Sequence, residues 1–334
     1  MQTLVLSRSS LSVRLEGNHL LVHDHARPDE PVTKVPLATV GRVVVSGQPA
    51  ISFPVLARLM DLEIPCSFMT SGGRWRGLMD GDRGFHADRR MRQYESLANE
   101  DFCRDFTRRV ILAKMKNGRR TIQRLAANRN EAIEKSTDWK VLTDCLAEVA
   151  RLETVDSIRG LEGVAAARYF RLLARFFPKD VPFTERTRRP PRDAANALLS
   201  FVYTLLENEV VAAIRSHGLD VAAGYFHRDH GRSPSLALDL MEPFRPALAD
   251  RLVLDLLNHH RLLPQRHFEP VGNGGVHLTD EGRPIVFRAF DETLLRQRET
   301  PHGHLTLRQM IDRDVCAYLA FLEKGVSPTF FKVA

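Results

Sequence analysis

The sequence has few cysteines and no long apolar run. Cys66, Cys103, Cys145 and Cys316 stand singly among 334 residues, and no two of them have CxxC spacing. This scatter predicts reduced, mostly buried thiols, with neither a zinc site nor a disulfide framework. No apolar run approaches the ~20 residues needed to cross a bilayer, and the N-terminal segment lacks the layout of a signal peptide. We therefore expect a cytoplasmic protein without membrane contact.

Acidic residues are scarce in one segment of a chain whose formal net charge is +7. Between Arg104 and Arg129 the sequence has nine basic residues and a single acid, Asp105. A second basic cluster lies beside two prolines and contains Arg186, Arg188, Arg189 and Arg192. Clusters of one sign indicate a polyanionic partner such as nucleic acid, with a solvated charged surface as the alternative.

Periodicity divides the chain into two parts. Up to residue 85 it has short β-branched or alternating runs, a hairpin turn predicted at Gly17–Asn18, and one amphipathic helix over Ser52–Leu62. From Tyr94 onward apolar residues recur with the period of a helix. The clearest helix is predicted to have Asp193 as its N-cap and Gly218 as its stop signal.

These patterns predict an α+β chain with a β-rich, sandwich-like domain over residues 1–85 and a polar connector over 86–93. A larger all-helical domain follows over 94–324, and a tail over 325–334. The tail is apolar, so it is either a loose end or a docking strand.

The stretch SLALDLMEPFRPALAD, residues 235–250, places two acids beside two prolines. Asp239 and Glu242 are three residues apart, so a helix would point both carboxylates in one direction. Pro243 and Pro246 remove amides that would bond the carbonyls of these acids, so the helix is predicted to kink or restart. Two interpretations stay open: two acids aimed at a shared ion, or two surface acids beside a helix break.

Two further segments place a side chain that can bind metal in an unusual setting. Glu162 lies between Gly160 and Gly163 at a predicted helix start, where glycines let a ligand approach closely. His227 follows an apolar stretch that ends in two aromatic residues. Each has an ordinary alternative: a helix-dipole partner for Glu162, and a core or interface side chain for His227. Periodicity alone cannot bring them together.

The order of segments along the chain resembles that of the CRISPR-associated protein 1 family. The resemblance rests on LEGVAAARYF, RTRRPPRDAANALLSFVYTLL, GLDVAAGYFH and SLALDLMEPFRP, and in the N-terminal half on ISFPVLARLMDLEIPCSFMTSGGRWRG. It covers nearly the whole chain. It implies a β-sandwich-like domain joined to a helical catalytic domain, and the activity of a metal-dependent DNA endonuclease and integrase that inserts new spacers.

The resemblance also implies a ligand set. The family's metal ligands, a Glu, a His and an acid, correspond to Glu162, His227 and Glu242. Asp239 corresponds to a second acid one turn earlier, which either binds the metal or orients its neighbours. Carboxylates suit Mg²⁺, and a histidine ligand moves the preference toward Mn²⁺. The implied reaction joins the 3′-hydroxyl ends of a short DNA to the CRISPR repeat by transesterification.

Several basic or hydrogen-bonding side chains are candidates for DNA contact near this site. They are Arg245, Arg188, Arg189, Arg119, Arg120, Arg124, Tyr203 and Asn196. Surface charge is the alternative for each arginine. Packing is the alternative for Tyr203, and a helix-end hydrogen bond is the alternative for Asn196.

The resemblance implies three kinds of partner. These are double-stranded DNA (prespacer and CRISPR repeat), a second copy of the chain that dimerises through the β-rich domain of residues 1–85, and the second CRISPR adaptation protein in a heterohexamer. Two other functions stay open: a stand-alone repair nuclease for branched DNA, and a catalytically idle DNA-binding scaffold. The intact Glu, His and Glu set argues against the scaffold.

Overall fold

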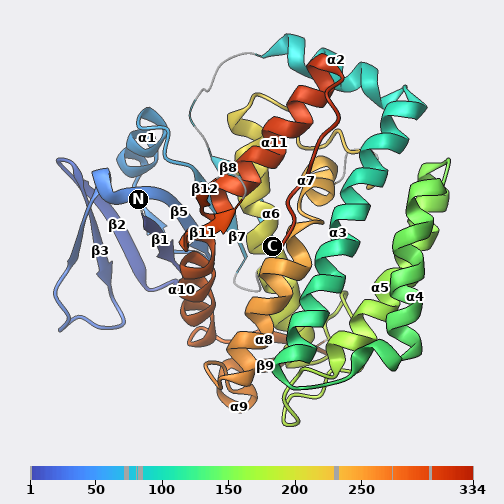
Figure 1. Cartoon of the computed structure of the whole chain (residues 1–334). Coiled ribbons are helices and arrows are strands. Elements are labelled where there is room, and N and C mark those ends of the chain that lie inside the picture. The colour runs from blue at the N-terminus through green and yellow to red at the C-terminus, as the bar shows by residue number, and fades with distance from the viewer. Residues whose placement is uncertain are drawn as a thin grey trace.

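Two four-stranded sheets make up most of the N-terminal part of the chain, and helices make up most of the rest (Figure 1). The computed structural model describes residues 2–70, 75–79, 81, 86–228, 233–272, 274–300 and 303–333. The expected α+β class, with a β-rich region before a helical one, is confirmed.

The first sheet has the strand order β1–β5–β7–β8. Its strands are β1 (Gln2–Leu6), β5 (Val40–Ser46), β7 (Cys66–Met69) and β8 (Trp75–Met79). The second sheet has the order β4–β3–β2–β6, and its strands are β4 (Thr33–Pro36), β3 (His19–Asp24), β2 (Leu11–Glu16) and β6 (Ala50–Ile51). Both sheets share one apolar core with α1 (Phe53–Asp61). The hairpin predicted at Gly17–Asn18 is confirmed, because Glu16 pairs with His19.

Strand β5 contributes to two cores because it is buried on both faces. Val43 points into the core of the two sheets, and its neighbour Val44 points into the core of the helices, as the two-residue period of a strand requires. Arg42, also on β5, is buried and forms ion pairs with Glu209 and Asp291 of the helical region. Apolar contact and buried charge therefore both fix the sheets to the helices.

The helical region runs from α2 to α11. Its longer helices are α2 (Ala87–Leu97), α3 (Glu100–Asn128), α4 (Thr137–Glu148), α5 (Val155–Ala174), α6 (Ala194–Ser216), α10 (Gly282–Leu295) and α11 (Leu307–Lys324). Its shorter helices are α7 (Ser235–Leu240), α8 (Arg251–Asn258) and α9 (Pro264–His267). Short 3₁₀ turns cover Leu37–Thr39, Ile133–Lys135 and Val149–Arg151.

Two details differ from the sequence prediction. The expected polar connector over 86–93 lies almost entirely within α2, whose polar side chains face solvent along most of the helix. The region expected to be all-helical also contains two short antiparallel hairpins. They pair β9 (Phe268–Val271) with β10 (Gly275–Leu278), and β11 (Arg298–Thr300) with β12 (Gly303–Leu305).

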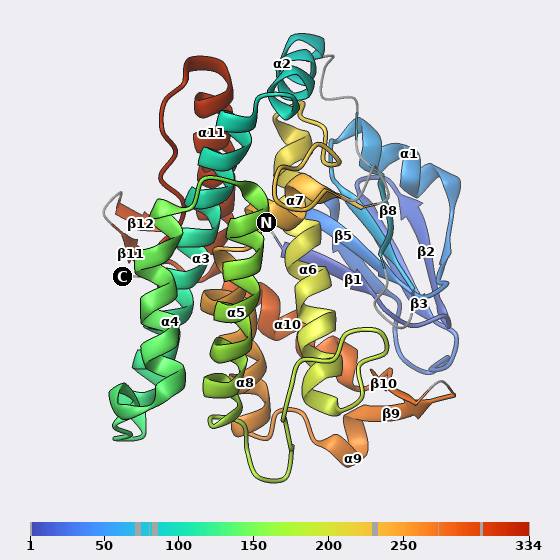
Figure 2. The same cartoon turned by 90° about the vertical axis from the view of Figure 1, so that its right-hand side faces the viewer.

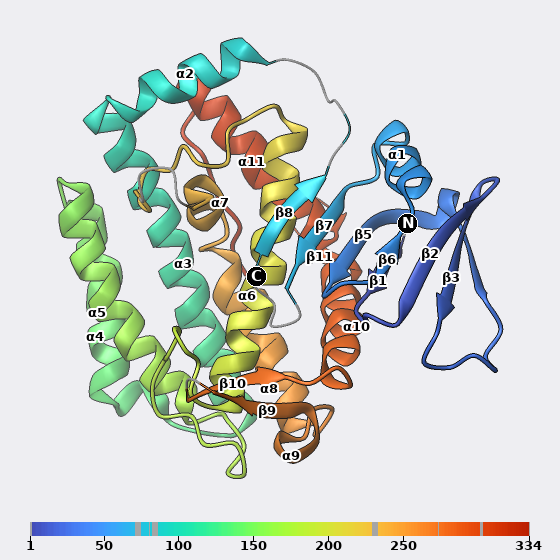
Figure 3. The ribbon, with the colours of Figure 1, turned by 180° about the vertical axis from the view of Figure 1, so that it is seen from behind.

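Helix α6 is the core helix of this region and lies between α5 and the strands in Figure 2, and between α3 and β8 in Figure 3. Asp193 caps its first turn by accepting a hydrogen bond from the N–H of Asn196, as predicted. Contrary to the expectation from the sequence, α6 is long and apolar enough to cross a membrane. Because 67% of its apolar window is buried inside the molecule, we interpret it as a core helix.

The C-terminal tail is docked against the helices, although it does not form the strand that was one of the two predictions. Figure 1 shows it running back from the end of α11 toward α3. The side chain of Asn117, on α3, donates to the carbonyl of Phe331 and accepts from the N–H of Val333, both at 2.9 Å. The ring of Phe331 stacks on that of Phe244 with centroids 4.6 Å apart. The tail thus supports the segment that follows Glu242.

Candidate active site

Three of the predicted site residues converge from segments far apart in the sequence. Glu162 lies in α5, His227 in the loop after α6, and Glu242 in the turn after α7. The ammonium of Lys114, from α3, lies 2.6 Å from one oxygen of Glu162 and 2.6 Å from one oxygen of Glu242. Nε2 of His227 lies 3.7 Å from the other oxygen of Glu242. These three side chains therefore surround one small region next to Lys114.

Asp239 fixes the orientation of His227. Its buried carboxylate accepts hydrogen bonds from the backbone N–H groups of Tyr225, Phe226 and His227, at 2.7, 3.0 and 2.9 Å. It also accepts a hydrogen bond from Nδ1 of the His227 ring at 2.8 Å. The lone pair of the imidazole is then on Nε2, the nitrogen that faces Glu242. Four such bonds fill the lone-pair sites of a carboxylate, so Asp239 orients its neighbours in this structure.

The loop that carries His227 reaches Asp239 because residue 224 is glycine. A Cβ at position 224 would lie 2.5 Å from the carbonyl carbon of Ser235 and 2.8 Å from the amide nitrogen of Leu236. Both are backbone atoms at the start of α7, so they cannot move without displacing that helix. Gly224 therefore allows the close approach that brings the loop N–H groups to the carboxylate.

The prolines of residues 235–250 interrupt the helix, as predicted. Helix α7 ends, and a turn followed by a π-helical segment, Arg245–Asp250, leads into α8. Asp239 is 0% exposed and Glu242 is 1% exposed, so the interpretation as surface acids is wrong. The irregular backbone directs the two acids to the two ring nitrogens of His227.

Cations surround Glu242. Burial alone would raise its pKa, but the charges of Arg245 and Lys114, the two largest opposing effects, outweigh burial and lower the pKa to about 2. Burial also disfavours the ammonium of Lys114, yet Glu242 and Glu162 outweigh it and raise the pKa of this lysine. The carboxylate of Glu242 is therefore ionised at neutral pH, the state in which a carboxylate binds a divalent cation.

Arg245 packs against Tyr203, and the buried carboxylate of Asp250 holds Tyr203 in place. The Arg245 guanidinium lies over the ring of Tyr203, 4.9 Å from its centroid. The hydroxyls of Tyr203 and Tyr169 donate to the two oxygens of Asp250, each at 2.7 Å. Burial raises the pKa of Asp250 to about 6 in spite of these bonds. Tyr203 therefore both packs against Arg245 and forms a hydrogen bond, with Asp250 as its partner.

Asn196 has a structural role at the start of α6. Its amide donates to the side chain of Asp193 at 2.6 Å and to the carbonyl of Glu185 at 2.9 Å. Its oxygen accepts from Arg186 and from the N–H of Thr187, both at 2.9 Å. Asn196 is 0% exposed and these four bonds occupy its amide, which favours the helix-end hydrogen bond over contact with DNA.

Glu162 lies inside α5, not at the predicted helix start. The helix begins earlier, with a capping box formed by Thr154 and Ser157. Gly160 and Gly163 are exposed, and a Cβ at either position would meet no atom within 4 Å. The glycines thus leave open surface on both sides of Glu162, where a partner has room to approach.

Two of the predicted DNA-contacting arginines line hollows that adjoin the site. Arg188 lines a cavity together with Glu162 and Arg245. Arg189 lines a larger groove together with His227. Both arginines are exposed, so their guanidinium groups are accessible to phosphate.

The predicted arginines of α3 lie against two different neighbours. Arg119 lies over the ring of Trp139, 5.1 Å from its centroid. Arg124 lines a cavity beside the C-terminal tail together with Arg251. Burial lowers the pKa of Arg124, and the nearby charges of Arg120 and Arg251 lower it further. Arg120, Arg124 and Arg251 therefore concentrate positive charge near the tail, while Arg119 packs on α4.

Sequence reasoning did not assign Lys114, Asp250 or Tyr169 to the site. The position of Lys114 in the sequence could have indicated its role. It lies three residues after Ile111 and four after Val110, both fully buried on the apolar face of α3. A lysine on an apolar helix face needs a buried acidic partner. Asp250 and Tyr169 gave no such signal, because only the fold brings them together.

The donor set suits a divalent cation. Glu162 and Glu242 already share one positive charge, the Lys114 ammonium, so the two carboxylates converge on one cation. The free nitrogen of His227 faces the same region. Two carboxylates and one imidazole leave coordination positions open for water and phosphate, and suit Mg²⁺ or Mn²⁺.

Comparisons with known proteins agree on one family. The family model described as CRISPR associated protein Cas1 matches residues 4–292. The chain is 34% identical over 276 residues to a CRISPR-associated endonuclease Cas1 from Chlorobaculum tepidum, covering 81% of this chain and 80% of the relative. It is 36% identical over 279 residues to one from Rhodospirillum rubrum, covering 80% of each protein.

Solved structures share the fold. A casposase bound to integration product matches with a TM-score of 0.88 at 21% identity, covering 100% of this chain and 95% of that chain. A chain of a Cas6-RT-Cas1–Cas2 complex matches with a TM-score of 0.81 at 24% identity, covering 100% of this chain and 36% of that chain. At these identities the likeness extends to the fold alone.

The hydrogen bonds of Asp239 predict the effect of replacing it. In Asp239→Asn an NH₂ group would face N–H donors, so the loop should lose hydrogen bonds and His227 its orientation. We expect a lower melting temperature and an affinity for Mn²⁺ that is ~10- to 100-fold weaker. Calorimetric titration with Mn²⁺ measures the affinity.

The matched control is Asp255→Asn, which alters the exposed His259–Asp255 pair on α8 and should change neither property. Wild-type melting temperature together with a loss as large as that of His227→Ala would mean that Asp239 binds the ion directly. Wild-type values of both properties would contradict the orienting role.

The Lys114 ammonium would compete with a divalent ion for Glu162 and Glu242. Lys114→Met should therefore lower the stability of the metal-free protein and raise its affinity for metal. Without the ammonium, Glu162 and Glu242 repel each other, and the metal-free protein should melt at a lower temperature. A divalent ion no longer competes with a unit charge a few ångströms away, so we expect Mn²⁺ affinity to rise at least about tenfold. Lys116→Met, on the exposed face of the same helix, is the control. Weaker Mn²⁺ binding by Lys114→Met would contradict the competition.

Proposed function

The chain belongs to the CRISPR-associated Cas1 family of DNA endonucleases and integrases, and we propose that Glu162, His227 and Glu242 hold the divalent ion this chemistry requires. The observation that carries the proposal is the Lys114 ammonium, which touches both carboxylates beside the free nitrogen of an oriented histidine. The protein acts on DNA in CRISPR adaptation as an integrase and endonuclease.

The reaction that fits this site is transesterification. The 3′-hydroxyl of a short DNA attacks a phosphorus of the CRISPR repeat; a new P–O bond forms, and the repeat's own 3′-oxygen leaves. When bound, the ion supplies positive charge to the phosphate oxygens. Asp239 keeps the lone pair of His227 on Nε2. Arg245, held over Tyr203 beside Glu242, contributes a fixed positive charge to the cavity where a phosphate is bound.

The substrates and partners form part of the same proposal. The substrate is double-stranded DNA, both prespacer and CRISPR repeat, and the ion is Mn²⁺ or Mg²⁺. The chain forms a homodimer in the cytoplasm, and two such dimers flank a dimer of the second CRISPR adaptation protein. The solved complex whose chain shares this fold is named for Cas1 and Cas2, which supports a second adaptation protein as the partner and leaves the stoichiometry as part of the proposal.

The two basic regions are proposed to bind DNA at different places. Arg188 and Arg189, in hollows that adjoin the ligand set, contact the strand that reacts. The α3 region with Arg119, Arg120 and Arg124 contacts duplex DNA farther from the site. Both roles follow from charge and position, since phosphate contacts carry most of the affinity for DNA.

Strand transfer tests the function. A short duplex with 3′-hydroxyl ends is incubated with a plasmid that carries a CRISPR repeat, in the presence of Mn²⁺, Mg²⁺ or a chelator. We expect metal-dependent joining, and at least ~100-fold less of it with His227→Ala or Glu242→Gln, as for the loss of a charge-stabilising contact in a transition state. Duplexes that end in 3′-dideoxynucleotides should not be joined, because the attacking hydroxyl is missing.

His259→Ala, which alters an exposed histidine on the far end of α8, is the control and should keep full activity. The ligand assignment is refuted by a His227→Ala protein that joins DNA at the wild-type rate and has the wild-type melting temperature. Cleavage of branched DNA without any joining would favour a repair nuclease.

Salt dependence of DNA binding tests the two basic regions separately. The double variant Arg188→Ala/Arg189→Ala should bind duplex DNA more weakly for every sequence. The slope of log affinity against log salt should fall by ~0.9 for each phosphate contact removed. The triple variant Arg119→Ala/Arg120→Ala/Arg124→Ala tests the α3 region in the same way, and Arg14→Ala, exposed on β2, is the control. A variant with unchanged affinity and slope would show that its region faces solvent.

A further inference from the structure

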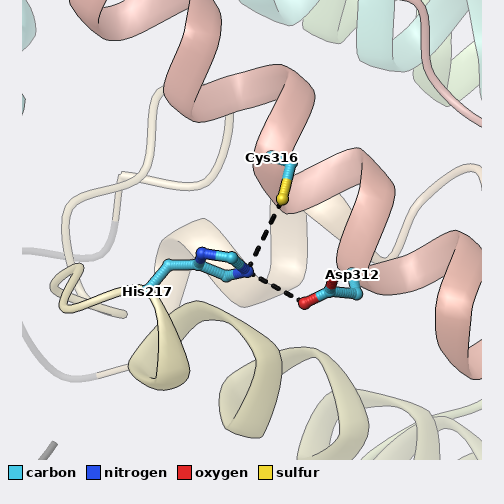
Figure 4. A group of neighbouring side chains, drawn as sticks. All are labelled: His217, Asp312 and Cys316. Atoms are coloured by element: carbon cyan, nitrogen blue, oxygen red, sulfur yellow. Dashed lines mark hydrogen bonds and ion pairs between the residues drawn. The ribbon is translucent and has the colours of Figure 1, made fainter.

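A cluster of three donor side chains lies outside the proposed ligand set, where the end of α6 meets α11 (Figure 4). His217 follows the last residue of α6, and Asp312 and Cys316 lie four residues apart on one face of α11. Nε2 of His217 is 2.9 Å from an oxygen of Asp312 and 3.6 Å from Sγ of Cys316. All three donor atoms lie within 4.8 Å of one another.

This arrangement does not suit a catalytic thiol. In a Cys–His–Asp relay the imidazole uses one nitrogen for the thiol and the other for the acid. Here both Asp312 and Cys316 face Nε2 of His217. Three donors that converge on one point, one of each of the types that zinc accepts, are instead typical of metal ligands.

The spacing of the donors fits a tetrahedral zinc site. Bonds of ~2.3 Å to sulfur and ~2.1 Å to nitrogen at tetrahedral angles place these two atoms ~3.6 Å apart. The observed separation of Sγ and Nε2 is 3.6 Å. An oxygen ligand would lie ~3.4 Å from the nitrogen, so Asp312 has to withdraw by about half an ångström. Its side chain is 53% exposed, so this movement meets little resistance.

We propose that His217, Asp312 and Cys316 bind one Zn²⁺ ion, with water as the fourth ligand. A thiolate and an imidazole select zinc over Mg²⁺ and Ca²⁺, which prefer oxygen. The site differs from the prediction that none of the cysteines takes part in a zinc site. It is independent of the proposed function, because it shares no residue with the set of Glu162, His227 and Glu242.

The ion would bind where helices α2, α6 and α11 meet. Arg89 of α2 donates to the backbone carbonyl of His217 at 2.9 Å and pairs with Glu323 of α11 at 3.2 Å. A bound ion adds a covalent-like link between α6 and α11 to these polar contacts, and so stabilises the folded chain.

Cobalt titration tests the site, because Co²⁺ replaces Zn²⁺ in tetrahedral sites and gives a charge-transfer band when a thiolate is bound. The reduced, metal-free full chain is titrated with Co²⁺ and then with Zn²⁺. We expect one equivalent of Co²⁺ to produce the band and one equivalent of Zn²⁺ to remove it. Cys316→Ser should abolish the band, and Asp312→Asn should weaken it. Zn²⁺ should raise the melting temperature of the wild type by more than that of Cys316→Ser, which keeps the set of Glu162, His227 and Glu242.

Cys316 and Asp312 are exposed, so both variants should keep the fold, which circular dichroism checks. The control is His259→Gln, which alters an exposed His–Asp pair and should keep the band. A wild-type protein without the thiolate band overturns the proposal and leaves the cluster as hydrogen-bonded side chains. A band that persists in Cys316→Ser also overturns it, because the thiolate would then belong to one of the buried cysteines, Cys66, Cys103 or Cys145.

Discussion

One ammonium between two carboxylates sets the charge balance on which the helical region depends. Lys114 belongs to α3, Glu162 to α5 and Glu242 to the turn after α7, so the contact joins three segments. Two acids this close would otherwise repel each other, and one would tend to take up a proton. The ammonium offsets this repulsion by pairing with both carboxylates, and Arg245, held over Tyr203, adds a second positive charge beside Glu242. The same arrangement therefore ties the helices together at the place where we propose that a divalent ion binds.

Features that depend on a few neighbouring residues could be predicted from the sequence. The hairpin at Gly17–Asn18 and the N-cap at Asp193 follow from turn and capping chemistry, which is local. Pro243 and Pro246 likewise identify the break after α7, because a missing amide acts within one turn. That Glu162, His227 and Glu242 lie close together could be predicted only from the resemblance to a known family, because no local periodicity relates residues of distant segments.

The features that could not be predicted from the sequence depend on tertiary packing. Asp250 is an ordinary acid in the sequence, and only the fold places the hydroxyls of Tyr203 and Tyr169 on its two oxygens. The polar composition of residues 86–93 predicted a connector, yet helix α2 forms there because its few inward side chains find partners: the amide of Gln93 donates to the backbone carbonyl of Asp220 at 2.7 Å. In each case the deciding partner comes from another part of the chain.

The docking of residues 330–333 has a consequence for synthesis. Asn117 binds the backbone of this segment, and Phe331 stacks on Phe244, two residues after Glu242. During translation α3 and α7 emerge from the ribosome long before these last contacts are available. The nascent chain therefore carries Glu242 on a segment that lacks its final support. The segment that carries Glu242 therefore gains this support only once residues 330–333 have been synthesised and have docked on α3.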